Sequence, residues 1–211
     1  MHEGDGVAFL VAASLDADVA VVTSLPDVSE LTLSFEAWRD WFIETAALAC
    51  RKTHANAVTV FFQSDIVYAG RWVDKGHLVS LAAEQAGVPC VFHKIACRAP
   101  AGKAIGRPGY SHLLAFSRTI SADAARELPD VLPQLGALPW ARAMGVEACA
   151  LVCRYLLEST ACRTVLDPFC GVGTMLEVAN QHGLDAMGVE IAPHRAARAR
   201  TLRLRLRERA P

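Results

Sequence analysis

Residues 165–190 constrain the fold of this chain more than any other segment. A short apolar run ends in Asp167 and passes into a turn that contains Gly171 and Gly173, and the apolar spacing after the turn indicates a helix. A second strand pattern follows and ends in Glu190. A strand, a glycine turn, a helix and a second strand with a terminal acid are the elements that hold a nucleoside-containing ligand in a parallel sheet.

The two glycines have a mechanical purpose in this turn. Gly171 and Gly173 can adopt positive φ and carry no Cβ, so a ligand can approach their backbone closely. The turn is not a dinucleotide fingerprint, because no third glycine follows, and it is not a P-loop, because Gly-Lys-Ser/Thr is absent. For the glycines alone, a tight strand-to-helix turn without a ligand is the alternative.

The full octapeptide from Asp167 to Thr174, Asp-Pro-Phe-Cys-Gly-Val-Gly-Thr, is more specific than its glycines. It resembles motif I of S-adenosylmethionine-dependent methyltransferases, in particular the amino-methyltransferases that modify exocyclic nitrogens of nucleic-acid bases. The resemblance implies that Glu190 binds the ribose hydroxyls of S-adenosyl-L-methionine and that Ile191 lies on its adenine. The residues that it places along the cofactor's methionine and ribose parts are Asp167, Pro168, Phe169, Gly171, Gly173 and Thr174.

Composition and charge argue against several other classes. The chain has 211 residues, 53% of them hydrophobic, and a net charge of -1, which favours one domain with a large core over a strongly basic body. No apolar run reaches the roughly 18 residues that span a membrane, and the first residues lack the basic region of a signal peptide. The seven cysteines lie mostly in apolar surroundings, which indicates reduced thiols and a cytoplasmic protein.

Two groups of cysteines could be metal ligands. Cys149 and Cys153 lie on one face of an expected helix and fit a core better than a ligand set. Cys90, His93 and Cys97 fall on an expected strand, where Cys90 points away from the other two. Since a zinc site needs about four convergent ligands, we expect no metal site from either group.

Hydrophobic periodicity predicts strands that alternate with helices. Ser34 is placed to cap a helix, Gly87 to end one and Pro193 to begin one. The expected fold is α/β: a Rossmann-like class I methyltransferase with a mostly parallel seven-strand sheet and an antiparallel hairpin at one edge. The expected strands are 18–22, 57–62, 90–95, 112–116, 165–167 and 185–190, and the expected helices are 7–11 (or a turn), 35–52, 74–86, 141–158, 175–179 and 193–209.

The order of the segments departs from the common methyltransferase order, because the motif I segment comes late in the chain. The segment Thr23-Ser24-Leu25-Pro26-Asp27 occupies the place of motif IV, and the helix near Gly145 resembles motif X. This order is similar to the circularly permuted β group of DNA amino-methyltransferases and their RNA-directed relatives. It implies that Thr23 and Gly145 border the cofactor. It also places Gly4-Asp5 at the end of the remaining strand, which is very short, with Asp5 meeting the adenine. We expect a single domain, 1–211, with a catalytic half at 1–120, a linker at 121–139 and a cofactor-binding half at 140–211.

The expected catalytic loop departs from the family pattern, which is Ser/Asn/Asp-Pro-Pro-aromatic. The resemblance implies that Ser24 and the carbonyl of Leu25 accept hydrogen bonds from the target amine. Pro26 is kept, but Asp27 replaces the aromatic residue that stacks on an extruded base. Two interpretations of Asp27 stay open: it accepts a proton or a hydrogen bond from the amine, or it caps the loop.

Basic and aromatic residues indicate a nucleic-acid substrate. No inserted segment is large enough for a DNA target-recognition domain, so we expect a structured RNA, such as tRNA or rRNA. The expected substrate contacts are Trp72, which can stack on an unpaired base, and Arg98, Lys103 and Arg107 in a basic loop. The arginine-rich segment 195–209 can bind phosphates or form a solvated helix, and a homodimer through it or through the sheet edge is left open.

Two other functions fit the same cofactor segment. A methyltransferase of protein or small-molecule substrates would bind the same cofactor but transfer nothing to nucleic acid. A non-catalytic methyltransferase-like partner subunit is the third candidate, and the altered loop at Asp27 is its best support.

Overall fold

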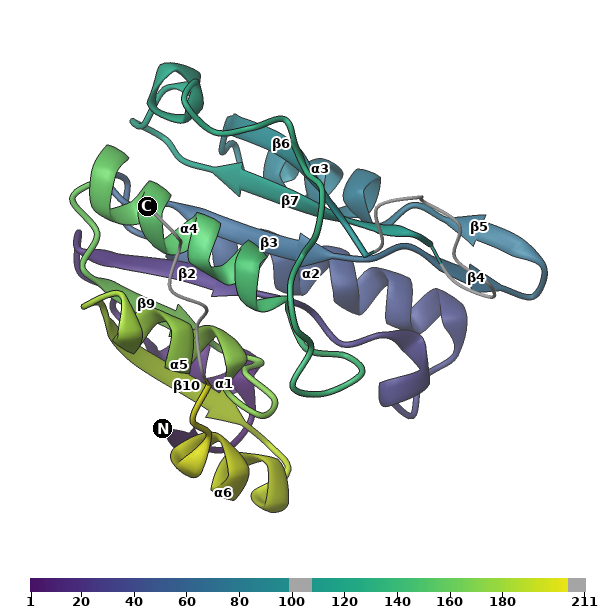
Figure 1. Ribbon diagram of the computed structural model, residues 1–211. Coiled ribbons are helices and arrows are strands. Elements are labelled where there is room, and N and C mark those ends of the chain that lie inside the picture. Colours follow the sequence, from purple (N-terminus) through teal and green to yellow (C-terminus); the bar gives the residue numbers. More distant parts are fainter. Residues whose placement is uncertain (99–107, 205–211) are drawn as a thin grey trace.

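An eight-stranded sheet forms the centre of the structure (Figure 1). The computed structural model describes residues 1–98 and 108–204. The strands from β1 to β3 in the order below are parallel, β7 is antiparallel to both of its neighbours, and β8 runs parallel to β6. From one edge to the other the strands are β1 (His2–Glu3), β10 (Asp185–Glu190), β9 (Thr164–Asp167), β2 (Val19–Thr23), β3 (Thr59–Gln63), β7 (Tyr110–Phe116), β6 (Cys90–Cys97) and β8 (Val131–Leu132).

Helices cover both faces of this sheet (Figure 1). One face carries α1 (Gly6–Ala12), α2 (Phe35–Lys52) and α3 (Lys75–Gln85), and the other carries α4 (Val146–Ser159) and α5 (Thr174–Gln181). The last helix, α6 (Pro193–Thr201), packs beside β10 and β1, and two short 3-10 helices occur at η1 (Val28–Glu30) and η2 (Ala122–Ala125). None of the helices in the described ranges is long and apolar enough to cross a membrane.

Strand alternation explains the two apolar layers. Along β2, Ala20 and Val22 pack on the side of α4 and α5, whereas Val19 and Val21 pack on the side of α2 and α3. All of β2 is buried, as is typical of a central parallel strand with helices on both faces. Trp38 and Phe42 of α2 are fully buried in the second layer. The apolar runs of the sequence therefore form two core layers, one between the sheet and the helices on each face.

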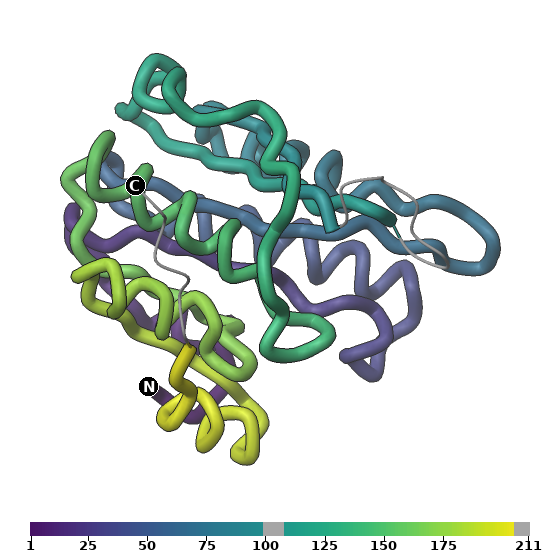
Figure 2. The backbone as a smooth tube through the Cα atoms, viewed as in Figure 1, coloured from purple at the N-terminus to yellow at the C-terminus, as the bar shows by residue number. Residues whose placement is uncertain are grey.

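Segments that are far apart in the sequence meet at the centre of the sheet. Figure 2 shows β2, from the purple N-terminal part of the chain, beside β9, from the green C-terminal part. The two strands are parallel, and Val21 pairs with Leu166. Their carboxyl ends, Thr23 and Asp167, therefore lie at the same edge of the sheet.

The predicted element boundaries that depend on local capping are confirmed. The Ser34 hydroxyl accepts a hydrogen bond from the Ala37 backbone N–H at 3.2 Å and begins α2, which ends at Lys52 as expected. Gly87 follows α3 with a positive φ of 67°, as expected for a glycine that ends a helix. Pro193 is the first residue of α6.

The mostly parallel sheet with an antiparallel hairpin is confirmed, but the expected number of strands and the edge are wrong. β6 and β7 form the antiparallel pair, yet the two-residue strand β8 pairs with β6 and adds an eighth strand outside it. β8 and η2 both lie within 121–139, the segment expected to be a linker. A run of two residues gives no periodic signal, so this pairing was not visible in the sequence.

A second hairpin, β4 (Ile66–Tyr68) with β5 (Arg71–Val73), was also not expected. Its turn places Ala69 and Gly70 at positive φ, 47° and 74°, which suits a two-residue hairpin turn. Trp72, expected in a loop, lies on β5 opposite Val67. The hairpin extends away from the main sheet beyond β3 (Figure 1).

Two helix ends differ from the predicted ones. α4 begins at Val146 rather than near Ala141. The backbone N–H groups of Glu147 and Ala148, in its first turn, donate to the Leu135 carbonyl instead of to carbonyls of a preceding helical turn. α6 ends at Thr201 rather than near 209, since Leu202 leaves the helical conformation. The expected helical residues from 205 onward lie outside the described part of the chain.

Gly145, the residue before α4, offers a test of the packing against Leu135. A Cβ at Gly145 would lie 2.0 Å from the Leu135 carbonyl oxygen, which is backbone and cannot move aside cheaply. We expect Gly145→Ala to lower the free energy of unfolding by about 1–3 kcal/mol. Urea unfolding measures it, with Gly4→Ala as the control, because a Cβ there meets only the movable His2 ring. Equal stabilities of the two variants would contradict the close packing at Gly145.

Candidate cofactor and acceptor site

The site lies where the central strands β2 and β9 end. The Thr23 hydroxyl donates a hydrogen bond of 2.7 Å to Asp167 Oδ1, which ties the two carboxyl ends together. The chain leaves these neighbouring strands toward opposite faces of the sheet, so a crevice opens between the two loops that follow. Parallel sheets bind ligands at such crevices, and more than half of the predicted cofactor residues line a pocket there.

The glycine turn after β9 has the expected conformation. Gly171 and Gly173 have φ of 56° and 82°, which residues with a Cβ rarely adopt. A Cβ at Gly173 would also approach Ala199 of α6 to 2.9 Å. The turn therefore starts α5 at Thr174 and lets α6 pack closely behind it.

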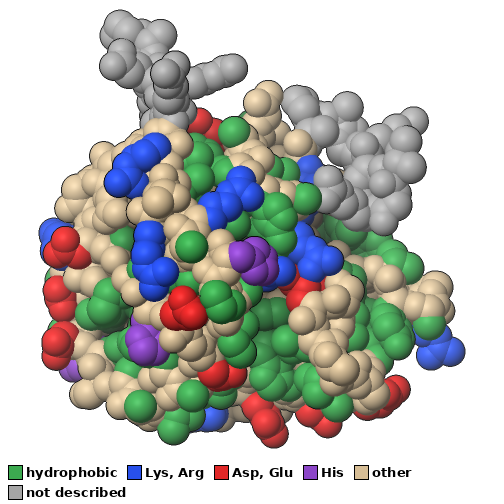
Figure 3. Space-filling model, turned by 90° about the horizontal axis from the view of Figure 1, so that it is seen from below, with side chains coloured by type: hydrophobic (Ala, Val, Ile, Leu, Met, Phe, Trp, Pro, Cys, Tyr) green, Lys and Arg blue, Asp and Glu red, His purple; other side chains and the backbone are tan. Residues whose placement is uncertain are grey.

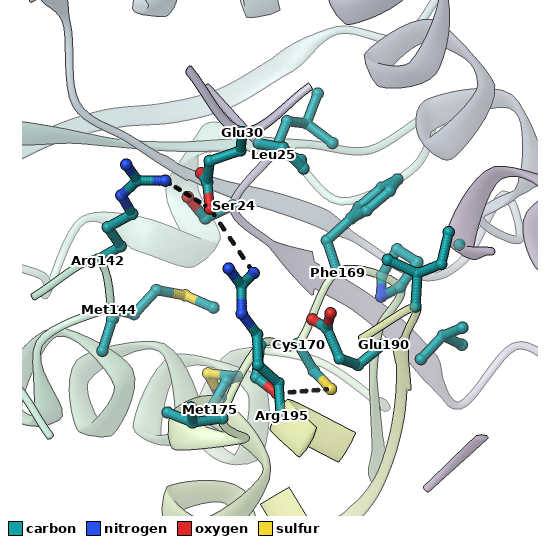
Figure 4. Close-up of a pocket in the computed structure, with 18 of the residues that line it drawn as sticks. Ser24, Leu25, Glu30, Arg142, Met144, Phe169, Cys170, Met175, Glu190 and Arg195 are labelled. Atoms are coloured by element: carbon teal, nitrogen blue, oxygen red, sulfur yellow. Dashed lines mark hydrogen bonds and ion pairs between the residues drawn. The ribbon is translucent and has the colours of Figure 1, made fainter. Parts of the chain in front are cut away.

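A first pocket opens along this turn (Figure 4). Seven predicted cofactor residues line it: Asp5, Pro168, Phe169, Gly171, Thr174, Glu190 and Ile191. Ser24, Leu25 and Pro26 of the predicted catalytic loop line it as well. Four other predicted cofactor residues, Thr23, Gly145, Asp167 and Gly173, are not part of its wall. Gly145 instead packs against the backbone of Leu135.

Asp167 lies under the floor of this pocket and is fully buried. Its Oδ1 accepts from Thr23 and from the Phe169 backbone N–H at 3.1 Å, whereas its Oδ2 has no hydrogen-bond partner in the described chain. Burial raises the pKa of Asp167 to about 7, against the two hydrogen bonds, and the nearby Glu190 carboxylate adds to the rise. Asp167 therefore orients the turn from behind.

Glu190 ends β10 at the opposite wall of the pocket. Its side chain is buried, and Oε1 accepts a hydrogen bond of 2.8 Å from the Ala192 backbone N–H. Ile191 beside it is 67% exposed and offers an apolar surface at the pocket rim. Just after the neighbouring strand β1, the Gly4 backbone N–H donates to the Glu190 carbonyl, and the next residue, Asp5, caps α1 by accepting from the Ala8 backbone N–H at 2.8 Å. The arrangement places one carboxylate and one apolar side chain where a nucleoside can lie.

Two ion pairs that were not predicted, both with Glu30, lie in the wall of the pocket. Arg142 lies 2.9 Å and Arg195 3.7 Å from Glu30 Oε1, and Figure 4 shows both guanidinium groups pointing toward that carboxylate. Arg195 also lies over the ring of Trp140, 4.8 Å from its centroid. Glu30, Arg142 and Arg195 come from three segments that are far apart in the sequence, so no local pattern predicts that they meet.

A second pocket adjoins the first, and five residues line both: Ser24, Leu25, Glu30, Arg142 and Ala143. Asp27 and Lys75 line the second pocket only, and they form an ion pair there. The other residues that it adds include Phe62, Ser64, Asp65, Val67 and Arg98. The predicted catalytic loop therefore separates two adjoining cavities.

Hydrogen bonds fix the loop between the pockets. The Trp38 indole N–H donates to the Pro26 carbonyl at 3.1 Å, and the Asp27 backbone N–H donates to Glu30 Oε2 at 3.2 Å. The Ser24 hydroxyl has no partner among the described residues and faces both pockets. Ser24 is thus a polar side chain of the loop with no protein partner among the described residues.

Asp65, at the back of the second pocket, was not predicted. It is buried and accepts hydrogen bonds from His112, the Lys75 backbone N–H, Trp72 and Tyr110. Burial opposes its ionisation, but the electrostatic interaction with His112 and the hydrogen bonds from His112, the Lys75 backbone and Trp72 together lower the pKa of Asp65. Four donors join β5, α3 and β7 to one carboxylate, which is a structural role.

The cysteines have no convergent set of metal ligands in the described ranges. One group of three possible ligands does lie within 4.8 Å there, formed by Asp65, Asp74 and His112. Its oxygens already accept protein hydrogen bonds. Cys170, inside the glycine turn, is buried, and burial raises the pKa of its thiol, which suits packing.

The predicted substrate residues are only partly placed. Arg98 lines the second pocket and donates to the Ser64 hydroxyl at 2.6 Å. Trp72 lies outside the pocket wall, beside Asp65 and opposite Val67, which do line it. Lys103 and Arg107 lie outside the described residues.

Comparisons with known proteins establish the fold. No family model and no curated protein match the sequence. The structure is similar to TTHA0409, a putative DNA modification methylase from Thermus thermophilus complexed with S-adenosyl-L-methionine, with 21% identity and a TM-score of 0.72 over 95% of this chain and 90% of that one. It is also similar to PvuII DNA methyltransferase (cytosine-N4-specific), with 15% identity and a TM-score of 0.71 over 94% and 83% of the chains. The M1.HpyAVI–SAM complex is similar as well, with 14% identity and a TM-score of 0.61 over 95% of this chain and 96% of that one. The predicted class I methyltransferase fold is confirmed.

The buried Asp167 carboxyl predicts an unusual pH dependence of stability. Its folded pKa of about 7 lies above the ordinary value of 3.8, so the folded state binds more protons between these values and loses stability as pH rises through them. The Asp167→Asn variant has no carboxyl to ionise at this position and should not lose this stability. The free energy of unfolding of the variant minus that of wild type should therefore rise by up to about 4 kcal/mol between about pH 4 and about pH 8. Urea unfolding at both pH values measures this difference.

The control for this series is Asp185→Asn, which removes an exposed carboxylate at the start of β10. Its stability should follow the wild-type pH profile. An Asp167→Asn profile parallel to that of wild type would show that Asp167 is ionised in the folded protein at ordinary acidic pH.

Proposed function

We propose that this protein is an S-adenosyl-L-methionine-dependent methyltransferase that modifies an exocyclic amino group of a nucleic-acid base. The observation that carries the proposal is the pair of adjoining pockets, which share wall residues. The first has the glycine turn and Glu190 on its walls, the second is open to Asp27, and Ser24 and Leu25 line both. A donor in the first pocket and an acceptor in the second would meet at the Ser24–Leu25 wall.

The residues of the first pocket fit this donor. Glu190 can accept hydrogen bonds from ribose hydroxyls, and Ile191 offers an apolar surface for adenine. Asp167 Oδ2 and Thr174 Oγ1 are buried polar atoms without a partner in the described chain, and both flank the turn where the resemblance puts the methionine part. A cationic amino group there would stabilise the ionised form of Asp167. Buried polar atoms of this kind are expected to have a partner in the functional state.

The chemistry asks little more of the protein than alignment. Bound S-adenosyl-L-methionine would supply an electrophilic methyl group on a sulfonium. The Ser24 hydroxyl and the Leu25 carbonyl would accept hydrogen bonds from the target amine and direct its lone pair toward the first pocket. Trp38 and Glu30 hold the following two residues of the loop, so these acceptors are fixed before the substrate binds.

The order of strands supports a circularly permuted arrangement within one domain. The strand that carries the glycine turn, β9, is near the end of the chain, while its neighbour β2, which carries Ser24 at its end, is near the beginning. We propose that the cofactor-binding half follows the catalytic half, as in the permuted β group. The resemblance of the segment order is the second support for this proposal.

DNA is the substrate that we propose to test first. The structures that this chain resembles include a putative DNA modification methylase and a cytosine-N4-specific DNA methyltransferase. The match to the former covers 90% of its chain, so the lack of a large inserted segment, which led us to expect RNA, does not argue against DNA. RNA stays the second candidate because the exposed Trp72 ring suits unpaired bases.

The rim of the second pocket supports a nucleic-acid acceptor. Trp72 is 55% exposed, and its N–H is bound to Asp65, so the ring has a fixed orientation with a free face. Ring faces of this kind stack on bases with little sequence preference. Basic and acidic side chains both occur on the described part of the face in Figure 3, so this face is not a broad surface of basic side chains alone.

A transfer assay tests the proposal. The protein is incubated with donor labelled on the methyl group and with separate DNA, RNA and protein fractions of a cell extract, and the products are digested with DNase, RNase or protease. We expect label in nucleic acid that is released as a methylated amino base. Label in protein or small molecules alone would overturn the nucleic-acid assignment, and bound donor without any transfer would favour a non-catalytic subunit.

Glu190→Ala provides the matched binding test. Loss of the ribose contacts should weaken binding of S-adenosyl-L-methionine by about 10-fold or more, since hydrogen bonds to a charged group are each worth about 1.5–3 kcal/mol. Glu158→Ala, which removes an exposed carboxylate on α4, should bind the donor as wild type does. Isothermal titration calorimetry measures both. Unchanged affinity in Glu190→Ala would contradict the placement of the donor.

A further inference from the structure

We propose that Asp27 and Lys75 together recognise the methyl acceptor in the second pocket, by hydrogen bonds to its amino-bearing edge in place of an aromatic stack. The inference rests on the proposed function and specifies how its acceptor site works. It concerns a pair of residues, Asp27 from the loop after β2 and Lys75 from the start of α3, that line the pocket and form an ion pair.

Lys75 is held in place on several sides. Its side chain is only 3% exposed, its ammonium group lies 5.9 Å from the centroid of the Phe42 ring, and its backbone N–H donates to Asp65 Oδ1 at 2.8 Å. Asp27 is the one hydrogen-bond acceptor of the ammonium group in the described part of the chain. An ammonium group has three N–H bonds, so two remain for an acceptor atom in the pocket.

Asp27 is fixed at its backbone and at its carboxylate. The backbone N–H donates to Glu30, and one carboxylate oxygen is bound to Lys75. The side chain is nevertheless 29% exposed toward the pocket that it lines. The result is an oriented acceptor group open to a ligand, next to an oriented donor group.

The location of the pair argues against a purely structural role. Burying a lysine ammonium carries a desolvation penalty that its ion pair often only just offsets, and apolar replacements of buried pairs are frequently as stable. Stability of the fold alone therefore gives no reason for an ion pair in the wall of the second pocket, which Ser24 also lines. Phe62, at 5% exposure, is the one aromatic residue of the described pocket wall, so a stacked base has little surface there.

The chemistry of the pair defines the ligand. The amine has two N–H bonds, so Asp27 accepts one of them jointly with the Ser24 hydroxyl or the Leu25 carbonyl. Lys75 donates to a ring nitrogen or a carbonyl oxygen, so together the pair matches a heterocycle that carries an amino group beside such an atom. Adenine and cytosine present this combination. During transfer the N–CH3 bond forms and the S–CH3 bond breaks with its electron pair left on sulfur. The amine then loses one proton to Asp27, which passes it to water in the pocket.

The test compares single and double variants of the pair. Asp27→Asn and Lys75→Met should each lower kcat/KM of methyl transfer by about 10- to 100-fold, the effect of losing one hydrogen bond to a charged group. Donor affinity should stay within about twofold of wild type, because neither residue lines the first pocket. The matched controls are Asp130→Asn and Lys94→Met, which break a second Asp–Lys ion pair outside both pockets and should transfer as wild type does.

The double variant Asp27→Asn/Lys75→Met separates recognition from folding. It removes both charges together and leaves no buried charge unpaired. If the pair recognises the acceptor, kcat/KM of methyl transfer by the double variant stays as low as in the less active of the two single variants. If the pair only neutralises itself, transfer returns toward the wild-type rate, and the inference is overturned.

The same experiment distinguishes this inference from the proposed function. Label in nucleic acid from wild type and equally from Asp27→Asn would overturn the role of the pair alone. Label in a protein amine that Asp27→Asn abolishes would overturn the nucleic-acid acceptor but keep the pair. Wild-type protein that binds donor and transfers to no fraction would overturn both.

Discussion

Asp167 accepts a hydrogen bond from Thr23 at the point where the two central parallel strands end, and the rest of the site is arranged around this contact. On one side of it the glycine turn leads into α5, and on the other side the loop that begins at Ser24 leads into η1. The contact joins residues 144 positions apart in the sequence. Asp167 is buried, and one of its oxygens has no partner among the described residues, so ionisation of Asp167 lowers the stability of the fold unless a cation binds beside it.

A second set of contacts supports the acceptor side in a similar way. Asp65 is buried, and its four donors fix the start of α3, the hairpin β4–β5 and β7 relative to one another. Through the Lys75 backbone this network fixes the ammonium group that pairs with Asp27. Each reactive position of the proposed site is thus held by a buried carboxylate behind it, Asp167 for the donor pocket and Asp65 for the acceptor pocket. Preorganisation of this kind is what an alignment mechanism requires.

Local signals explain what could be predicted from the sequence. The positive φ of Gly171 and Gly173, the cap at Ser34 and the acid at the end of β10 are each set by a few neighbouring residues. The roles of Lys75 and Arg142 could not be predicted, because their partners, Asp27 and Glu30, are distant in the sequence and no periodicity links them. The placement of Gly145 at the cofactor, made by resemblance, stays a prediction, whereas its close approach to Leu135 could not be predicted from the sequence. The two-residue strand β8 shows the same limit for the fold, since pairing alone defines it.

The central claim is that donor and acceptor pockets meet at the loop from Ser24 to Asp27. Hydrogen–deuterium exchange with and without S-adenosyl-L-methionine tests it most directly, because it reports where the donor binds even if no acceptor is known. The account predicts slower exchange in the turn and start of α5 (171–175), in the segment after β10 (190–195) and in the loop 24–27, with no change where Cys90 pairs with Phe116, at the end of β6 and β7 away from both pockets. Exchange that is unchanged at all three segments, or slowed only elsewhere, would contradict it.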